Sequence, residues 1–215
     1  KVHVRFHHRQ QASLDSKEWL WPKHKQLIEI LEKKQGMVLF VGPPGSGKTT
    51  VASGILKNLE TSLQVIHTLE WPVELNLTTA TQTERNPRNG LTPLEAARTA
   101  VRSNADIFFL NAIEDAETAE AVFFAAEAGL GVAATMSIAR PERVSQALSR
   151  AGIDAERQQE FVKAIVVSRR LPCVCPYCRL SLLPSVELRE EMAALLEEDA
   201  PEHIYTRSET GCPEC

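Results

Sequence analysis

The feature that most constrains this chain is an apolar run followed at once by a glycine-rich turn. Residues 37–41 read MVLFV, and residues 42–49 read GPPGSGKT. A continuous apolar run of this length is typical of a strand that is covered on both faces of a sheet. The residues after the turn favour a helix from about 48 to 59. The sequence therefore predicts a buried strand that turns directly into a helix.

The same alternation continues along the chain. Apolar runs at 64–69, 106–110 and 130–136 predict further strands, and segments 92–103, 115–128 and 141–150 predict helices. The helix at 92–103 has a clear start, because Thr92 can cap it, Pro93 suits its first position and Glu95 completes a capping box. A strand at 2–6 and helices at 19–34 and 186–198 are also expected. Strands that alternate with helices predict an α/β fold with a mostly parallel sheet covered on both faces.

The turn matches the G-x-x-x-x-G-K-[ST] pattern of a phosphate-binding P-loop. Its glycines let backbone N–H groups turn inward around a phosphate, and the helix that follows adds the positive end of its dipole. In this pattern Lys48 contacts the β- and γ-phosphates and the Thr49 hydroxyl binds Mg²⁺. We therefore expect ATP with Mg²⁺ here. The expected nucleotide-binding residues are Gly42, Pro43, Pro44, Gly45, Ser46, Gly47, Lys48, Thr49 and Thr50.

The cysteines predict a zinc site. All five lie after residue 172, and Cys175 with Cys178 and Cys212 with Cys215 form two C-x-x-C pairs. Two such pairs present four thiolates to one tetrahedral Zn²⁺ and leave no open position for water, so the zinc is expected to be structural. A disulfide framework or a redox pair fits this pattern less well. Cys173 is expected to be a spare thiol or a substitute for Cys175.

Composition argues against a nucleic-acid or membrane-spanning role. The net charge is −4, and residues 171–215 hold three Arg and no Lys against nine Asp and Glu. No nucleic-acid partner is therefore expected. No apolar run approaches the roughly 18 residues that a membrane-spanning helix needs, and the first ten residues lack the apolar stretch of a secretory signal. A cytoplasmic location is expected.

Several segments, in consistent order, resemble the motifs of one motor family. Residues 69–74 (LEWPVE) resemble its aspartate box I-E-D-P-V-E, 86–92 (NPRNGLT) its N-x-K-x-G-L-T stretch, and 115–120 (DAETAE) its D-x-E-T-A-E motif. Arg98 and Arg102 match its paired arginines, and residues 171–178 with 211–215 resemble its tetracysteine element. On these residues the chain is similar to the assembly ATPases of type II secretion systems and type IV pili (GspE/PulE/PilB-like), from about residue 36 to 215.

This resemblance implies a RecA-like core that self-associates in a ring, a hexamer or a mixed ring with a paralogue. It implies partners among the inner-membrane platform or assembly proteins, at the cytoplasmic face of that membrane. Residues 1–35 are then the end of an N-terminal subdomain and a linker, 36–170 the nucleotide-binding core, and 171–215 the zinc-binding element. The family extends beyond both ends, so the chain is expected to be part of a longer protein. Catalytic roles are implied for Glu70 as candidate base, Glu74, Arg98 and Arg102; for the two arginines a solvated basic stripe is the alternative.

The chain also departs from the family where hydrolysis is concerned. The family's Walker B segment ends in G-E-I-R-D, whereas residues 111–115 read NAIED, so Ala112 replaces the glutamate that positions Mg²⁺ and water. Trp71 replaces the aspartate of the aspartate box, Ser137 replaces the histidine of the histidine box, and Glu84 replaces a glutamine. Glu114 would substitute for the lost carboxylate only if the strand end bends inward.

Three functions remain open on the sequence. The first is a scaffold that binds ATP and assembles with impaired or absent hydrolysis. The second is an active hexameric ATPase with Glu70 as its base. The third, a zinc-ribbon nucleic-acid module, is disfavoured by the acidic C-terminal part. Because the P-loop is intact while groups for phosphoryl transfer are missing, the sequence favours the scaffold.

Overall fold

The computed structural model describes residues 24–60, 64–74, 76–86, 90–170, 174–175, 177–196 and 201–206. The chain divides into two compact units, Lys1–Arg170 and Leu171–Cys215. The predicted strand at 2–6 and the first part of the helix expected at 19–34 lie outside the described residues. No helix within the described ranges is long and apolar enough to cross a membrane.

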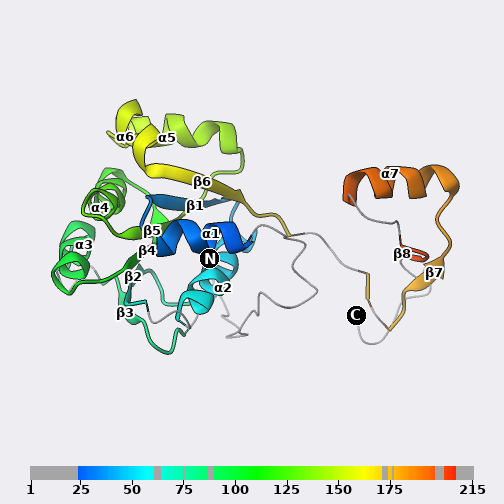
Figure 1. Cartoon of the computed structure of the whole chain (residues 1–215), viewed down its shortest axis with the longest axis horizontal. Coiled ribbons are helices and arrows are strands. Elements are labelled where there is room, and N and C mark those ends of the chain that lie inside the picture. Colours follow the sequence, from blue (N-terminus) through cyan, green and yellow to red (C-terminus); the bar gives the residue numbers. More distant parts are fainter. Residues whose placement is uncertain are drawn as a thin grey trace, which may run out of the picture. The chain divides into compact units, whose positions relative to one another are not determined.

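The first unit is built on a six-stranded sheet in the order β3-β2-β4-β5-β1-β6. Every neighbouring pair is parallel, which confirms the α/β fold with a parallel sheet (Figure 1). The strands are β1 (Met37–Val41), β2 (Ile66–Glu70), β3 (Thr81–Glu84), β4 (Ile107–Ile113), β5 (Gly131–Met136) and β6 (Val162–Val167).

Helices cover both faces of this sheet (Figure 1). On one face α1 (His24–Glu32) and α2 (Lys48–Glu60) pack in a core that contains Val38 and Phe40. On the other face α3 (Pro93–Arg102), α4 (Ala116–Glu127) and α5 (Val144–Arg150) pack against Leu39. The remaining elements there are a 3-10 turn (η2, Pro141–Arg143) and α6 (Ala155–Phe161). Alternate residues of β1 thus feed two different cores, which is why its whole run is apolar.

Local signals explain where the helices begin and how closely they pack. Thr92 caps α3, with the reciprocal hydrogen bonds to Glu95 that the capping box predicts, and Asp115 caps α4 in the same way with Thr118. Gly131 at the start of β5 is required for close approach, because a Cβ there would lie 2.2 Å from the Leu31 carbonyl oxygen. The end of α1 therefore rests directly on the sheet.

Some elements differ from the sequence prediction. The strand β3 was not predicted, because its residues TQTE show no apolar pattern. Neither α6 nor β6 was predicted, because no turn residue separates the helix from the strand. The strand predicted at 106–110 extends to Ile113, and the helix expected at 141–150 begins with a 3-10 turn.

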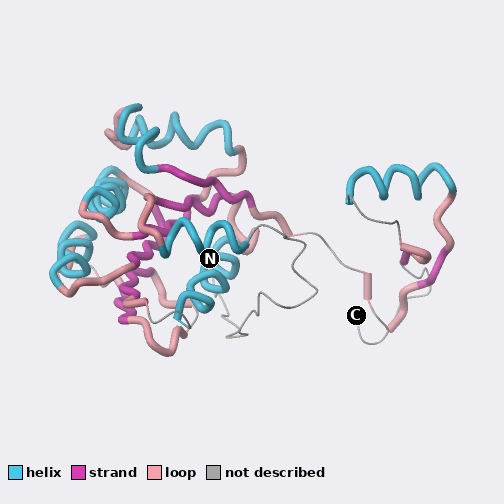
Figure 2. The backbone as a smooth tube through the Cα atoms, viewed as in Figure 1, coloured by secondary structure: helices cyan, strands magenta, loops and turns pink. Residues whose placement is uncertain are grey.

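The second unit contains two short antiparallel strands, β7 (Leu180–Leu182) and β8 (Ile204–Thr206), and the helix α7 (Val186–Leu196) (Figure 2). The Arg179 guanidinium stacks on the Tyr205 ring, with its carbon 3.9 Å from the ring centre. This contact joins the segment after Cys178 to β8.

Candidate nucleotide site

The glycine-rich loop lies at the carboxyl end of β1 and leads into α2. A Cβ at Gly42 would lie 2.4 Å from the Ser46 hydroxyl oxygen and 2.7 Å from the Ser168 carbonyl oxygen, so only glycine fits there. Gly47 has a φ of +90°, which other residues rarely adopt. The loop therefore has the tight, side-chain-free backbone of a phosphate cradle at the start of a helix of 13 residues.

Lys48 folds back over this loop. Its Nζ donates a hydrogen bond of 3.0 Å to the Pro43 carbonyl, and the residue is 9% exposed. Ser46 is buried and its hydroxyl lies 3.3 Å from that of Ser168, which follows β6. Thr49 and Thr50 are half-buried at the start of α2. The predicted nucleotide-binding residues are thus contiguous around one helix start.

A row of polar residues crosses the sheet on the same face as α2. Residue pairing aligns Glu84 of β3 with Glu70 of β2, Glu70 with Asn111 of β4, and Thr135 of β5 with Phe40 of β1. The Thr135 hydroxyl donates to the Asn111 amide oxygen at 2.5 Å, which joins the two halves of the row. Paired residues of neighbouring strands point to one face, and Phe40 packs in the α1–α2 core. We call Glu84, Glu70, Asn111 and Thr135 the polar row.

Glu70 is the member of the polar row whose carboxyl group is buried. It is 2% exposed, and its Oε1 accepts hydrogen bonds from the Thr68 hydroxyl at 2.7 Å and the Gln82 amide at 2.9 Å. The Glu74 backbone N–H also donates to the carboxyl group. Burial raises the pKa of Glu70 above its usual value, and these hydrogen bonds oppose that shift.

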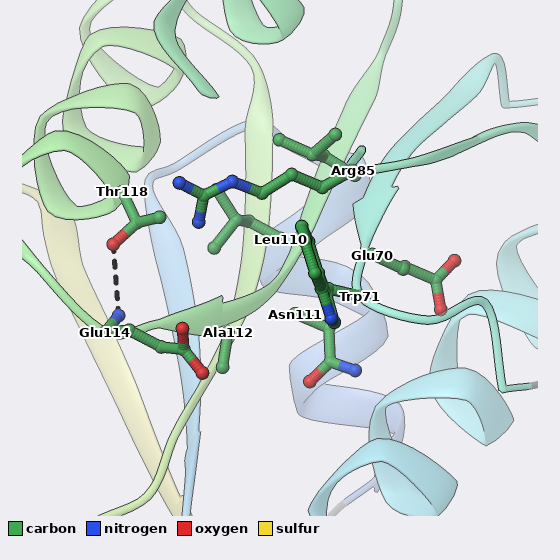
Figure 3. A pocket seen from close by; sticks show the side chains of 9 residues that line it. Glu70, Trp71, Arg85, Leu110, Asn111, Ala112, Glu114 and Thr118 are labelled. Atoms are coloured by element: carbon green, nitrogen blue, oxygen red, sulfur yellow. Dashed lines mark hydrogen bonds between the residues drawn. The ribbon is translucent and has the colours of Figure 1, made fainter. Parts of the chain in front are cut away.

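The residues that replace two of the family's catalytic groups lie beside the polar row. Trp71 and Ala112 come one position after Glu70 and Asn111, and all four line one small hollow with Arg85, Glu114 and Thr118. Figure 3 shows the Arg85 side chain over Trp71 and directed toward Thr118, whereas the Glu70 carboxyl group points away from both. Ser137, in the place of the family's histidine, is exposed just after β5.

Glu114 is not a member of the polar row. Its backbone N–H donates to the Thr118 hydroxyl at 3.0 Å, which holds it at the start of α4. Its exposed side chain lies beside Ala112 in Figure 3. Glu114 follows β4 and lines the same hollow as Glu70, Asn111 and Ala112, and its substitution for the lost carboxylate stays a prediction.

The paired arginines also lie on the face opposite α2. The Arg98 guanidinium carbon is 5.8 Å from the centre of the Phe124 ring of α4, and the Arg102 guanidinium donates to the Thr99 hydroxyl. Both residues are exposed on α3. Within one chain this arrangement favours the solvated basic stripe, and a role toward phosphate stays a prediction.

Only half of the predicted zinc site is described. Cys175 and Cys178 are half-buried in one turn, and the Arg179 N–H donates to the Cys175 carbonyl at 3.0 Å. Cys173, Cys212 and Cys215 lie outside the described residues. In the part of the chain that the structure describes, no group of three or more His, Cys, Asp or Glu side chains is placed to hold a metal.

Sequence reasoning missed the polar residues that share the row with Glu70. Asn111 was noted only as part of an altered segment, and Thr135 and Gln82 were not singled out. The available signal was alternation: counted along β4 and β5, both Asn111 and Thr135 fall on the face of Phe109 and Ala133, which lie in the α1–α2 core. Cross-strand pairing was needed to bring them together with Glu70.

The parallel sheet, the glycine loop at the end of β1 and the polar row on the α2 face define the core of a P-loop nucleotide-binding protein. Among solved structures the fold is similar to the Legionella pneumophila ATPase DotB, with a TM-score of 0.60 and 22% identity over 83% of this chain and 48% of that one. It is also similar to the pilus retraction motor PilT with bound ADP, with a TM-score of 0.58 and 21% identity over 81% of this chain and 57% of that one.

Sequence comparison then places the chain in a particular family. The family described as "Type II/IV secretion system protein" matches residues 1–215, and the chain belongs to it. Relatives include the type IV pilus assembly ATPase PilB of Acinetobacter baylyi, 32% identical over 90% of this chain and 34% of the relative. The type II secretion system ATPase E of Vibrio cholerae is 27% identical over 89% of this chain and 37% of the relative. The chain thus spans about a third of the length of these relatives.

The raised pKa of Glu70 predicts a pH dependence of stability. A raised folded-state pKa contributes stability that is present below the unfolded value of 4.5 and is lost as the pH rises through the folded value. We expect the free energy of unfolding of the wild type, minus that of Glu70→Gln, to fall as the pH rises above 4.5, by at most about 1.4 kcal/mol per pH unit. Urea denaturation at several pH values measures it, with Glu84→Gln as the matched control. A difference that is flat or rises with pH contradicts the assignment.

Proposed function

We propose that this chain is the nucleotide-binding core of a secretion or pilus-assembly motor protein that holds Mg-ATP but hydrolyses it slowly or not at all. The observation that carries the proposal is the contrast at the carboxyl edge of the sheet. The P-loop pattern of glycines, Lys48 and Thr49 is complete. Near the end of β4, by contrast, Asn111 presents a carboxamide and Ala112 a methyl group. The chain therefore keeps the groups for binding and lacks those for turnover.

The residues present fit a nucleoside triphosphate with Mg²⁺. At Gly42 the loop packs so closely that a Cβ would collide with the Ser46 hydroxyl, and the loop leads to the positive end of α2. Lys48 is positioned over the loop and would exchange its contact with the Pro43 carbonyl for phosphate oxygens. Thr49 would offer its hydroxyl to Mg²⁺, which when bound neutralises phosphate charge.

Hydrolysis requires a group that positions the attacking water, and Ala112 replaces the glutamate that does so in the family motif. Loss of such a group costs on the order of 10²–10⁴-fold in rate. Ala112 has no atom that accepts a proton or binds a metal, and Trp71 presents a ring that is 53% exposed where the family has a carboxylate.

A slow ATPase with Glu70 as base is the second candidate. It is favoured by the place of Glu70 in the polar row, on the face of α2, and by a pKa raised by burial. Against it, the Glu70 carboxyl group is already engaged by Thr68 and Gln82. These bonds tie it to β2 and β3 and limit its reach toward a water molecule.

The two candidates differ in phosphate release. We expect Mg-ATP to bind the wild type and phosphate release to be no greater than that of Lys48→Ala, because Ala112 replaces the carboxylate that positions water in the family motif. Nucleotide binding and release would be measured on the same zinc-loaded preparation. Steady release by the wild type that is lost in Glu70→Gln would establish the slow ATPase instead and reject the scaffold.

Family membership also supports a proposal on assembly. The relatives are named type IV pilus assembly and type II secretion ATPases. We therefore infer that the chain acts in the cytoplasm, at the inner-membrane face, where it assembles in a ring of like subunits or a mixed ring with an active paralogue. A subunit that binds ATP without hydrolysing it would contribute to such a ring a conformation that depends on the bound nucleotide.

The zinc site is the remaining proposal for the second unit. Cys175 and Cys178 lie in one turn, as a C-x-x-C knuckle requires. With Cys212 and Cys215 they would bind one structural Zn²⁺. We expect elemental analysis to find one zinc ion per chain and none after Cys178→Ser with Cys215→Ser. Cys173→Ser is the matched control, and zinc loss in that variant would instead make Cys173 a ligand.

A further inference from the structure

Asn111 is the one residue of β4 in the polar row. It pairs with Glu70 on one side and contacts Thr135 on the other. The family motif that this segment resembles has a glycine at this position, so the present chain adds a side chain where its relatives' motif has none. The Asn111 side chain is half-buried at the carboxyl edge of the sheet, the edge at which β1 continues into the glycine loop.

Thr135 fixes the orientation of the Asn111 amide. Thr135 is fully buried, and its hydroxyl donates to the Asn111 Oδ1 at 2.5 Å. Because the hydroxyl donates to the amide oxygen, the Nδ2 group on the other side of the amide is turned away from Thr135. Among the described residues no protein acceptor is assigned to that Nδ2 group. In Figure 3 the amide of Asn111 lies on the side of β4 away from Arg85 and Thr118.

The Asn111 Nδ2 group is half-buried and not sealed from solvent, so a ligand oxygen can take the place of water as its acceptor. The paired residue Glu70 offers its carboxyl group on one side of Asn111. On the other side a nucleotide in the glycine loop would offer phosphate oxygens, since β5 alone separates β4 from β1. The next residue, Ala112, adds no charge. A neutral donor here attracts an anionic phosphate, whereas a carboxylate would repel it.

We propose that Asn111 donates a hydrogen bond to the terminal phosphate of a bound nucleoside triphosphate and so makes the site prefer ATP to ADP. Thr135 is its positioning residue. The inference rests on the proposed function, because it presumes nucleotide binding at the glycine loop. It adds a preference for ATP over ADP, because Asn111, which takes the place of a glycine in the family motif, would contact the terminal phosphate.

The test is the ratio of two affinities on the full chain. Isothermal titration calorimetry with Mg²⁺ would compare ADP with a non-hydrolysable ATP analogue. In Asn111→Ala the analogue is expected to bind about tenfold more weakly, the effect of a hydrogen bond to a charged group, with ADP affinity changed less than about twofold. Asn111→Asp is expected to lower analogue affinity further, because its carboxylate repels the terminal phosphate.

The positioning role of Thr135 has its own readout. Thr135→Val keeps the shape of the side chain and removes the hydroxyl, so analogue affinity is expected to fall about threefold. Combined with Asn111→Ala it is expected to add little, because the two side chains act as one unit. Additive losses in the double variant would contradict a role through Asn111.

The controls separate the inference from the proposed function. Asn58→Ala removes an amide near the carboxyl end of α2, where it donates to the Gly54 carbonyl at 3.0 Å, and it is expected to leave the ratio unchanged. Retained ADP binding reports that each variant is folded. If Asn111→Ala keeps the wild-type preference, or loses ADP and the analogue equally, the inference is wrong while the proposed function stands. If the wild type binds neither nucleotide, the proposed function itself is overturned.

Discussion

The register of the parallel strands is the constraint on which the rest of the site depends. Pairing of β2 with β4, and of β5 with β1, puts Glu70, Asn111 and Thr135 side by side on the face that carries α2. The same register sends Leu69 of β2 and Leu110 of β4 to the opposite face, where they pack in the other core. The alternation of β4 is interrupted between Leu110 and Ile113, and Ala112 lines the same hollow as Glu70 and Asn111. A slip of one residue in either strand would put these leucines on the face of α2.

Binding and turnover can be lost separately in this architecture because they use different parts of the chain. Binding depends on the backbone of the glycine loop and on the start of α2, whose geometry is fixed by close contacts at Gly42. In the proposed function, turnover would depend on side chains at the ends of β2 and β4. In the proposed site the neutral amide of Asn111 adds no charge beside the terminal phosphate, and Ala112 lacks the carboxylate that the family motif has at that next position.

Much of the first unit follows from the sequence. The apolar run at 37–41 and the capping box at Thr92 locate strand and helix, because burial on two faces and cap hydrogen bonds leave strong local patterns. The polar strand β3 leaves no such pattern. The sequence also identified the glycine loop and the altered residue Ala112. It did not identify the partnership of Asn111 with Thr135, because cross-strand register is set by tertiary packing rather than by neighbours along the chain.

The central claim is that the site retains an intact nucleoside triphosphate. The most direct measurement is a crystal structure of the chain after prolonged incubation with Mg-ATP. The account predicts electron density for all three phosphates over the loop at Gly42 to Gly47, with the Asn111 amide within hydrogen-bonding distance of the terminal phosphate. Density for ADP alone, with the Glu70 carboxyl group turned away from Thr68 and Gln82 toward the site, would contradict it.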